Sequence, residues 1–192
     1  MRASPRCPRP SGRGHSSSVG GTAWHVVAAD VDPSWVAVQV AHDPLAAPLG
    51  ARFLAALADR VGAEPGVVDA VLAAPPPPAG PGVDLVEATP AQHPRVRRAL
   101  AHRTGVRVWT TPDGAGLLVL GRGVAGRWEA AVEVAPQARG RGLGTALAAA
   151  APALQPAGEP LWAQVAPANT ASLRAFLSAG WRPVCAEVLF GP

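Results

Sequence analysis

The stretch that decides the fold is VEVAPQARGRGLGT, residues 132–145. Its alternating start predicts a β-strand, and the apolar residues that follow at helical spacing predict a helix over residues 143–154. Gly140, Gly142 and Gly144 occupy the junction between the two. Glycine lets backbone N–H groups approach a ligand closely, and a helix N-terminus adds about half a positive charge. This succession of strand, glycine-rich turn and helix therefore indicates a pyrophosphate-binding loop.

Two other interpretations of the same turn stay open. The first is a plain glycine-rich turn that only starts a helix. The second is a dinucleotide-binding (Rossmann) loop, which requires the spacing G-x-G-x-x-G and an acid at the end of the next strand. The spacing here is G-x-G-x-G, and Glu159 precedes the strand expected at 161–166. The dinucleotide-binding interpretation is therefore weak, because the turn meets neither requirement.

The sequence around this loop predicts an α/β fold with a mixed sheet. After residue 82 the expected order is strand, helix, three strands, helix, strand, helix and strand, joined by short connections. Those elements are expected at 83–88, 94–103, 106–110, 117–120, 127–134, 143–154, 161–166, 169–179 and 181–190. The elements expected earlier are a strand at 24–31, helices at 33–40 and 49–61, and a strand or short helix at 67–73. Asp32 with Pro33 is the expected start of the first helix, and Gly62 is the expected end of the second.

PPPPAGPG, residues 75–82, is the clearest boundary in the sequence, because consecutive prolines form a stiff linker. We therefore expect an N-terminal α/β subdomain of unassigned role over residues 23–74 and a second domain over residues 83–192. Residues 1–22 are rich in Arg, Pro, Ser and Gly and have no apolar periodicity. We expect them to form a disordered basic tail that is dispensable for folding and for ligand binding.

The excess positive charge of the chain is concentrated at its N-terminus. Residues 1–29 contain four arginines and no acid, whereas residues 30–192 contain 13 arginines and 13 acids, so the body has no net charge. All 17 basic residues are arginines, and without lysine the chain can form neither a Walker A loop nor a Schiff base. A neutral body does not favour nucleic-acid binding, despite the basic N-terminus.

Three features missing from the sequence restrict the class of protein further. No uninterrupted apolar stretch reaches the roughly 18 residues that a membrane-spanning helix needs. The two cysteines, Cys7 and Cys185, do not predict a structural disulfide, which fits a reducing compartment and a cytoplasmic protein. The five histidines show no metal-ligand spacing, so we expect no metal site.

Two segments together resemble the GNAT N-acetyltransferase superfamily. QARGRG, residues 137–142, is preceded by V-x-V-x-P and followed by LGT, and it resembles the loop with which these enzymes hold the pyrophosphate of acyl-CoA. NTASLRAFLSAGW, residues 169–181, resembles the helix that comes next in the family, N-x-x-A/S-x-x-x-Y-x-x-x-G-F. Because both motifs occur in register, the resemblance is specific, and it extends over residues 83–192.

The resemblance implies a splayed mixed β-sheet flanked by helices, the GNAT-like fold, with acetyl-CoA as co-substrate. In that fold the pantetheine arm of CoA lies between two parting strands, here 127–134 and 160–166, and pairs with the backbone near Val132 and Val134. The side chain of Asn169 is expected to cap its helix, to bind CoA, or to do both. The residues expected to contact acetyl-CoA are Val132, Val134, Gln137, Arg139, Gly140, Arg141, Gly142, Leu143, Gly144, Thr145, Asn169, Ser172 and Phe176.

The chain departs from the family at two catalytic positions. Phe176 stands where many members have a Tyr that protonates the leaving sulfur, and the chain contains no tyrosine. Gln164 stands where some members have a basic Glu. The acids that remain nearby, Glu129 and Glu133, share the parity of one strand and so point the same way. We expect Glu133 to accept the proton of the acceptor amine and Glu129 to bind the acceptor, and for either acid a salt bridge is the alternative. The candidate partners for such a bridge are Arg107, Arg122 and Arg127.

Together these features predict an acetyl-CoA-dependent N-acetyltransferase that acts on a primary amine of a small molecule or a peptide. The amine would attack the thioester directly. The alternative is a CoA-binding module that has lost catalysis and serves as a sensor or interaction domain, and dinucleotide binding is third. We expect neither nucleic acid nor a membrane as partner, and assembly as a homodimer is left open.

Overall fold

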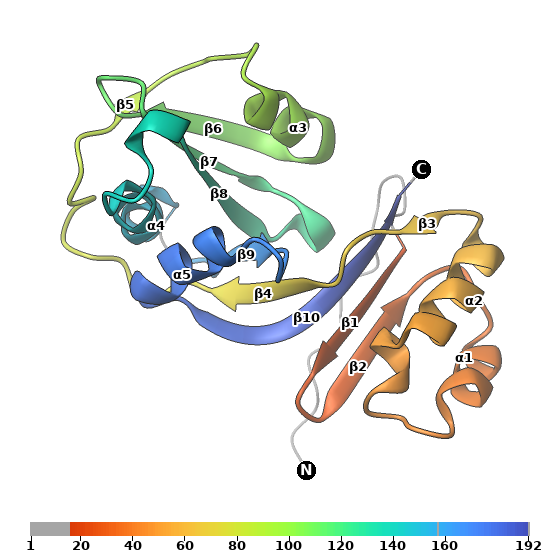
Figure 1. The fold of residues 1–192 in the computed structure, drawn as a ribbon. Helices are drawn as coiled ribbons and strands as arrows, with labels where there is room; N and C mark the ends of the chain where they lie inside the picture. The colour runs from red at the N-terminus through yellow and green to blue at the C-terminus, as the bar shows by residue number, and fades with distance from the viewer. Residues whose placement is uncertain (1–15, 157, 192) are drawn as a thin grey trace.

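The computed structural model describes residues 16–156 and 158–191, which form a mixed sheet with helices on its faces (Figure 1). The strands are β1 Ser17–Gly21, β2 Trp24–Ala28, β3 Glu64–Pro65, β4 Asp69–Ala73, β5 Val86–Glu87, β6 Thr104–Thr110, β7 Gly116–Arg122, β8 Trp128–Val134, β9 Leu161–Val165 and β10 Arg182–Gly191. The α-helices are α1 Pro33–Val40, α2 Ala51–Val61, α3 Pro94–His102, α4 Leu143–Leu154 and α5 Thr170–Ser178. The short 3-10 turns are η1 Ala47–Leu49, η2 Val124–Gly126 and η3 Pro136–Ala138. From β5 to β10 the order of strands and α-helices is the one predicted.

Local sequence signals account for the ends of the first two helices. The Asp32 carboxylate caps α1 by accepting the N–H of Ser34 at 2.7 Å, and Pro33 occupies the first turn. Gly62 ends α2 with a φ of 65°, in the left-handed region that side chains with a Cβ adopt rarely. Both expectations are confirmed.

None of the described helices is both long and apolar enough to cross a bilayer.

The strands pair in the order β2-β1-β10-β4-β9-β8-β7-β6-β5, and β3 pairs separately with β10. β8 and β9 run parallel, but they pair only at Trp128 with Leu161 and at Glu129 with Trp162. Beyond these pairs β8 continues beside β7, and β9 continues beside β4. The sheet therefore opens between the C-terminal ends of β8 and β9, and the expected splayed mixed sheet is confirmed.

The two faces of the sheet are covered by different helices. α4 and α5 pack on one face, where Leu147, Ala148 and Phe176 join a buried cluster with residues of β7, β8 and β9. α3 packs on the other face of β6 and β7 through Val96 and Ala99. The face covered by α3 is called the α3 face below.

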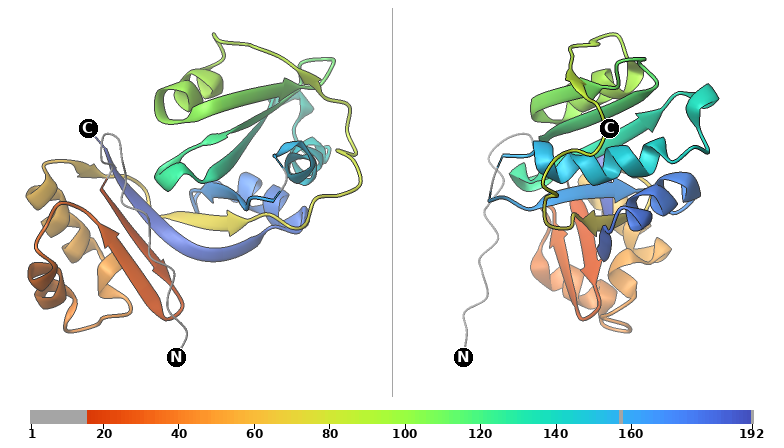
Figure 2. Two further views of the ribbon diagram at one scale, coloured as in Figure 1. Left: turned by 180° about the vertical axis from the view of Figure 1, so that it is seen from behind. Right: turned by 90° about the vertical axis from the view of Figure 1, so that its left-hand side faces the viewer.

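The N-terminal helices pack against the end of the same sheet. Phe53, Leu54 and Leu57 of α2 form a buried cluster with Val188 and Phe190 of β10. In Figure 1 and in the left-hand view of Figure 2, α1, α2, β1 and β2 lie together at one end of the molecule, apart from α3, α4 and α5. β10 is therefore shared: it pairs with β4 along its first half and supports the N-terminal helices with its second half.

The division predicted at the proline-rich stretch does not describe the sheet. β4 precedes residues 75–82 in the chain, yet it lies between β9 and β10. Its Val71 and Leu72 side chains are fully buried. Residues 23–74 and 83–192 thus contribute to one sheet, because backbone pairing of β4 with strands far along the chain overrides the local boundary signal. Residues 75–82 form a connection between β4 and β5.

The predicted boundary of the tail is also wrong. β1 occupies residues 17–21 and pairs with both β2 and β10. Ser18 is fully buried, and its hydroxyl donates to the Pro48 carbonyl at 2.7 Å. The strand SSVGG has no apolar periodicity because most of its side chains are small or absent. It is held in the sheet by backbone pairing on both edges. The rest of the tail prediction concerns residues 1–15, which lie outside the described residues.

Removal of residues 1–21 tests the contribution of β1. Without β1, β2 loses its described neighbour in the sheet and β10 loses one of its partners. We expect the Tm, measured by scanning calorimetry, to fall by several degrees or more, because backbone donors and acceptors of β10 would lose their partners. A chain that begins at His15 keeps every described element and is the control. Equal Tm values for the two shortened chains would contradict this role.

Candidate active site

The glycine-rich loop leads from β8 through η3 to α4 and leaves the N-terminus of α4 open. Gly140 and Gly142 have φ angles of 75° and 83°, in the left-handed region where a Cβ is strained. Gly142 is the N-cap of α4 and offers no side-chain acceptor to the first N–H groups of the helix. A Cβ built on either glycine would meet nothing within 4 Å, so the space around both is open. The backbone donors at this helix start can therefore bind an anion.

The arginines of the loop have different positions in the structure. Arg139 and Arg141 are both exposed. The Nε of Arg139 donates to the Val134 carbonyl at 3.0 Å, so this residue also holds the end of β8. A pantetheine arm that paired with Val134, as expected, would have to share this oxygen. Gln137 is exposed in η3 and lies on the same loop.

Several residues predicted to contact the cofactor have a packing role. A Cβ on Gly144 would lie 3.5 Å from the Ala175 Cβ and 3.7 Å from the Val134 Cγ2, both ordinary van der Waals distances, so Gly144 faces α5 and β8. Leu143, Val132 and Val134 pack against the core below α4. Thr145 is half-buried on α4.

The helix after β9 is held by its own capping interaction. The Asn169 Oδ1 accepts the N–H of Ser172 at 3.1 Å, which confirms the capping role of this residue. Phe176 is 3% exposed, and its ring meets Trp181 edge-on with centroids 4.8 Å apart. The predicted contact between Phe176 and acetyl-CoA is corrected: the ring lies in the core, because it packs into the aromatic pair.

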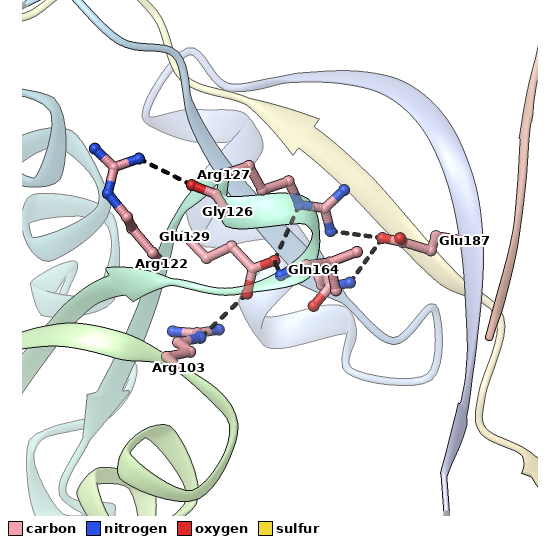
Figure 3. Close-up of polar contacts among 8 residues, drawn as sticks. Arg103, Arg122, Gly126, Arg127, Glu129, Gln164 and Glu187 are labelled. Atoms are coloured by element: carbon pink, nitrogen blue, oxygen red, sulfur yellow. Dashed lines mark hydrogen bonds and ion pairs between the residues drawn. The ribbon is translucent and has the colours of Figure 1, made fainter. Parts of the chain in front are cut away.

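Glu129 is buried on the α3 face and bound by two arginines (Figure 3). Its carboxylate lies 3.1 Å from the Arg103 Nε and 3.0 Å from the Arg127 Nε. The N–H of Val124 donates to the same carboxylate at 3.3 Å. Because Glu129 is only 2% exposed and its charge is already balanced, it is not placed to bind an acceptor. That expectation is corrected, and the salt-bridge alternative with Arg127 holds for Glu129.

Arg127 extends this network from β8 to β10 (Figure 3). Its Nη2 lies 2.6 Å from the Glu187 Oε2, and the side-chain amide of Gln164 donates to the same oxygen at 2.7 Å. Glu187 is 1% exposed. Among the described residues, two atoms of this network are buried without a hydrogen-bond partner, the Arg103 Nη1 and the Glu187 Oε1. Gln164, which was expected to lack a basic role, is thus a donor that holds a buried carboxylate.

Glu133 lies on the same face as Glu129 and remains accessible. It pairs in register with Leu117, a member of the cluster under α3. Its Oε2 lies 2.6 Å from the Arg95 Nε on α3, and both side chains are partly exposed. The salt-bridge alternative thus holds for Glu133 as well, with Arg95 in place of the partners expected. Of the two acids predicted on β8, Glu133 is still the one whose side chain is accessible to a substrate.

Asp69 stands beside Glu187 in the sheet, since the two residues form an antiparallel pair between β4 and β10. Burial raises the pKa of the Asp69 carboxyl above its ordinary value of 3.8, the negative charge of Glu187 raises it further, and Arg98 opposes the rise. Asp69 is half-buried. The two neighbouring carboxyl groups of Asp69 and Glu187 thus lie next to the opening of the sheet, and the part of the sheet that contains them is called the floor below.

Sequence reasoning missed Arg103, Asp69 and Glu187. The signal that singled out Glu129, an acid inside an apolar strand, was also present for the other two acids in DAVLA and CAEVLF. No local pattern indicated Arg103, which follows α3 and reaches Glu129 only in the folded chain.

The pH dependence of stability tests the environment of Asp69. Because folding raises the pKa of Asp69, its ionised form destabilises the fold once the pH exceeds the raised value. This penalty disappears as the pH falls below the ordinary value of 3.8. Asp69→Asn should therefore increase the Tm at neutral pH, and the gain should shrink as the pH is lowered. A gain that stays constant with pH would show that the charge of Asp69 is not its cause.

The described residues contain no group of three or more His, Cys, Asp or Glu side chains that could hold a metal ion.

Comparison with known proteins gives one family. Residues 104–181 match the acetyltransferase (GNAT) family. This segment includes β6 to α5 and therefore the opening of the sheet, the glycine-rich loop and the Asn169 cap. No curated protein sequence matches the chain.

Three solved structures match part of this chain. An acetyltransferase from the GNAT family of Colwellia psychrerythraea superposes with a TM-score of 0.47 at 15% identity, covering 67% of this chain and 57% of that one. A GCN5-related N-acetyltransferase from Sphaerobacter thermophilus gives 0.43 at 20% identity, with 73% and 56% covered. A GCN5-related N-acetyltransferase from Kribbella flavida gives 0.45 at 21% identity, with 72% and 63% covered. The matches span less than two thirds of the length of each of these chains.

Proposed function

We propose that this chain, in which residues 104–181 match the acetyltransferase (GNAT) family, transfers the acetyl group of acetyl-CoA to a primary amine. The family supports acyl transfer from acetyl-CoA in general. The amine acceptor and the roles of individual residues are the finer part of the proposal.

The observation that carries the proposal is the open N-terminus of α4 next to the opening between β8 and β9. Backbone donors at Gly142 and the first turn of α4 fit a pyrophosphate, because no side chain caps them and the space around Gly140 and Gly142 is open. Arg141 adds positive charge beside that position. The unpaired edges of β8 and β9 fit an extended arm, since their backbone groups lack strand partners beyond Glu129 and Trp162.

Bound acetyl-CoA would supply the acyl group as a reactive thioester. The chain's own residues would hold the cofactor at the loop and direct the amine to it from the α3 face. Glu133 would remove the proton from the amine, because it is the accessible acid of β8 on that face. Phe176 carries no hydroxyl, so protonation of the leaving sulfur would fall to water.

A change at Gly142 tests the cofactor site. Gly142→Asp places a negative charge where the pyrophosphate would bind, and we expect acetyl-CoA affinity, measured by calorimetry, to fall by about 2 kcal/mol or more. Gly142→Asn is the matched control, because Asn has the same shape, tolerates the left-handed region and carries no charge. A Gly142→Asp variant that folds and binds acetyl-CoA like the unchanged protein would contradict the assignment of the loop.

A change at Glu133 tests the proton acceptor. Glu133→Gln keeps the shape of the side chain but cannot take a proton, so kcat should fall about 100-fold while acetyl-CoA affinity stays nearly constant. Glu129→Gln is an instructive comparison, since it should lower stability through the loss of a buried ion pair. If the Glu133→Gln variant and the unsubstituted protein have the same kcat at every pH tested, a group other than Glu133 must accept the proton of the amine.

A second candidate function is CoA binding without catalysis. It is favoured by the absence of tyrosine and by the position of Gln164, whose amide is engaged with Glu187. An assay of thiol release over a panel of amines separates the two. CoA binding in calorimetry without thiol release for any amine would favour the binding module.

A further inference from the structure

The carboxyl groups of Glu187 and Asp69 lie beside the opening of the sheet. Trp162 is the last residue of β9 that pairs with β8, and Gln164 follows it on the separated part of the strand. The Gln164 amide donates to the Glu187 Oε2 at 2.7 Å. Glu187 is therefore one hydrogen bond away from the strand edge along which the acyl-CoA arm is proposed to lie, and Asp69 is its paired neighbour on β4.

Asp69 differs from the neighbouring acids Glu129 and Glu187 in its ion pairing. Arg103 and Arg127 make ion pairs with Glu129 and Glu187. No ion pair within the described part of the chain includes Asp69. Arg98 acts on Asp69 through its charge but makes no ion pair with it, so Asp69 is the carboxyl group of this set that has no paired arginine.

One oxygen of this pair also lacks a donor. The Glu187 side chain is 1% exposed, and its Oε1 is buried with no hydrogen-bond partner among the described residues, while Oε2 already accepts two donors. A buried acceptor without a donor costs free energy, so such an atom in a native protein calls for an explanation. A positively charged donor would supply the hydrogen bond that Glu187 Oε1 lacks and the ion pair that Asp69 lacks.

We propose that Asp69 and Glu187 form a binding site for a cationic group of the acceptor, so that the acceptor substrate is a molecule with more than one amine, such as a diamine. The acetyl transfer in this inference rests on the proposed function, whereas the binding of the cationic group does not. One ammonium group is held at the floor by the carboxyl pair, Asp69 forming its accessible side and Glu187 its buried side. A second amine is then presented to the acyl group at the opening between β8 and β9.

The test is calorimetric binding of putrescine, a diamine, and of butanediol, its uncharged analogue, to the full chain without acetyl-CoA. The unchanged protein should bind putrescine and not butanediol. Asp69→Asn should weaken putrescine binding about tenfold or more, because it removes one charge of the pair but keeps the shape of the side chain. Asp59→Asn on the exposed surface of α2 makes the same change in net charge and should leave the affinity unchanged.

The kinetic readout separates binding from proton transfer. In an acetyl transfer assay, Asp69→Asn should raise the KM for putrescine and leave kcat nearly constant, whereas Glu133→Gln should lower kcat. Glu187→Gln is a second variant for the same pair, provided that its melting curve shows a folded protein.

Four outcomes decide the proposal. Putrescine affinity that is equal for the unchanged protein and Asp69→Asn would overturn it, and so would an absence of putrescine binding. Putrescine binding that depends on Asp69 in a protein that releases no thiol would support the cation site and contradict the proposed acetyl transfer. Acetyl transfer to amines with no dependence on Asp69 would support the proposed function and reject the cation site.

Discussion

Arg127 joins Glu129 on β8 to Glu187 on β10, and both acids are almost completely buried. β8 and β9 separate after two residue pairs, so hydrogen bonds between these strands cannot hold the two halves of the sheet together beyond that point. The guanidinium group connects the halves across the α3 face instead. Breaking a buried ion pair by removing one partner costs several kcal/mol, since the remaining charge stays desolvated. Arg127 therefore links β8 to β10 beside the point at which β8 and β9 separate.

The second constraint is the position of β4. This strand comes from the N-terminal part of the chain, but it separates β9 from β10 and brings Asp69 next to Glu187. The N-terminal helices then cover the end of β10 through Phe53, Leu54 and Leu57. The N-terminal residues thus complete the floor of the candidate site and do not form a separate unit beside it.

The parts of the fold that could be predicted from sequence have strong local signals. Asp32 with Pro33, Gly62, and the glycine-rich turn before α4 each specify an end or a start through the conformation of a few consecutive residues. The splayed sheet followed from the resemblance carried by residues 137–142 and 169–181 and is seen in the short pairing of β8 with β9. β1 could not be predicted in this way, because small side chains give no periodic pattern and the strand is held by neighbours distant in sequence.

The sequence by itself determined the loop, its helix and the Asn169 cap, because these depend on residues close together in the chain. Only the tertiary structure decided the environment of each acid. Glu129 and Glu133 are four residues apart on one strand, yet one is buried between two arginines and the other is accessible beside Arg95. Asp69 and Glu187 are neighbours only because β4 inserts beside β10. The charge state and accessibility of a carboxyl group depend on burial and on charges brought from other strands, and sequence spacing does not contain that information.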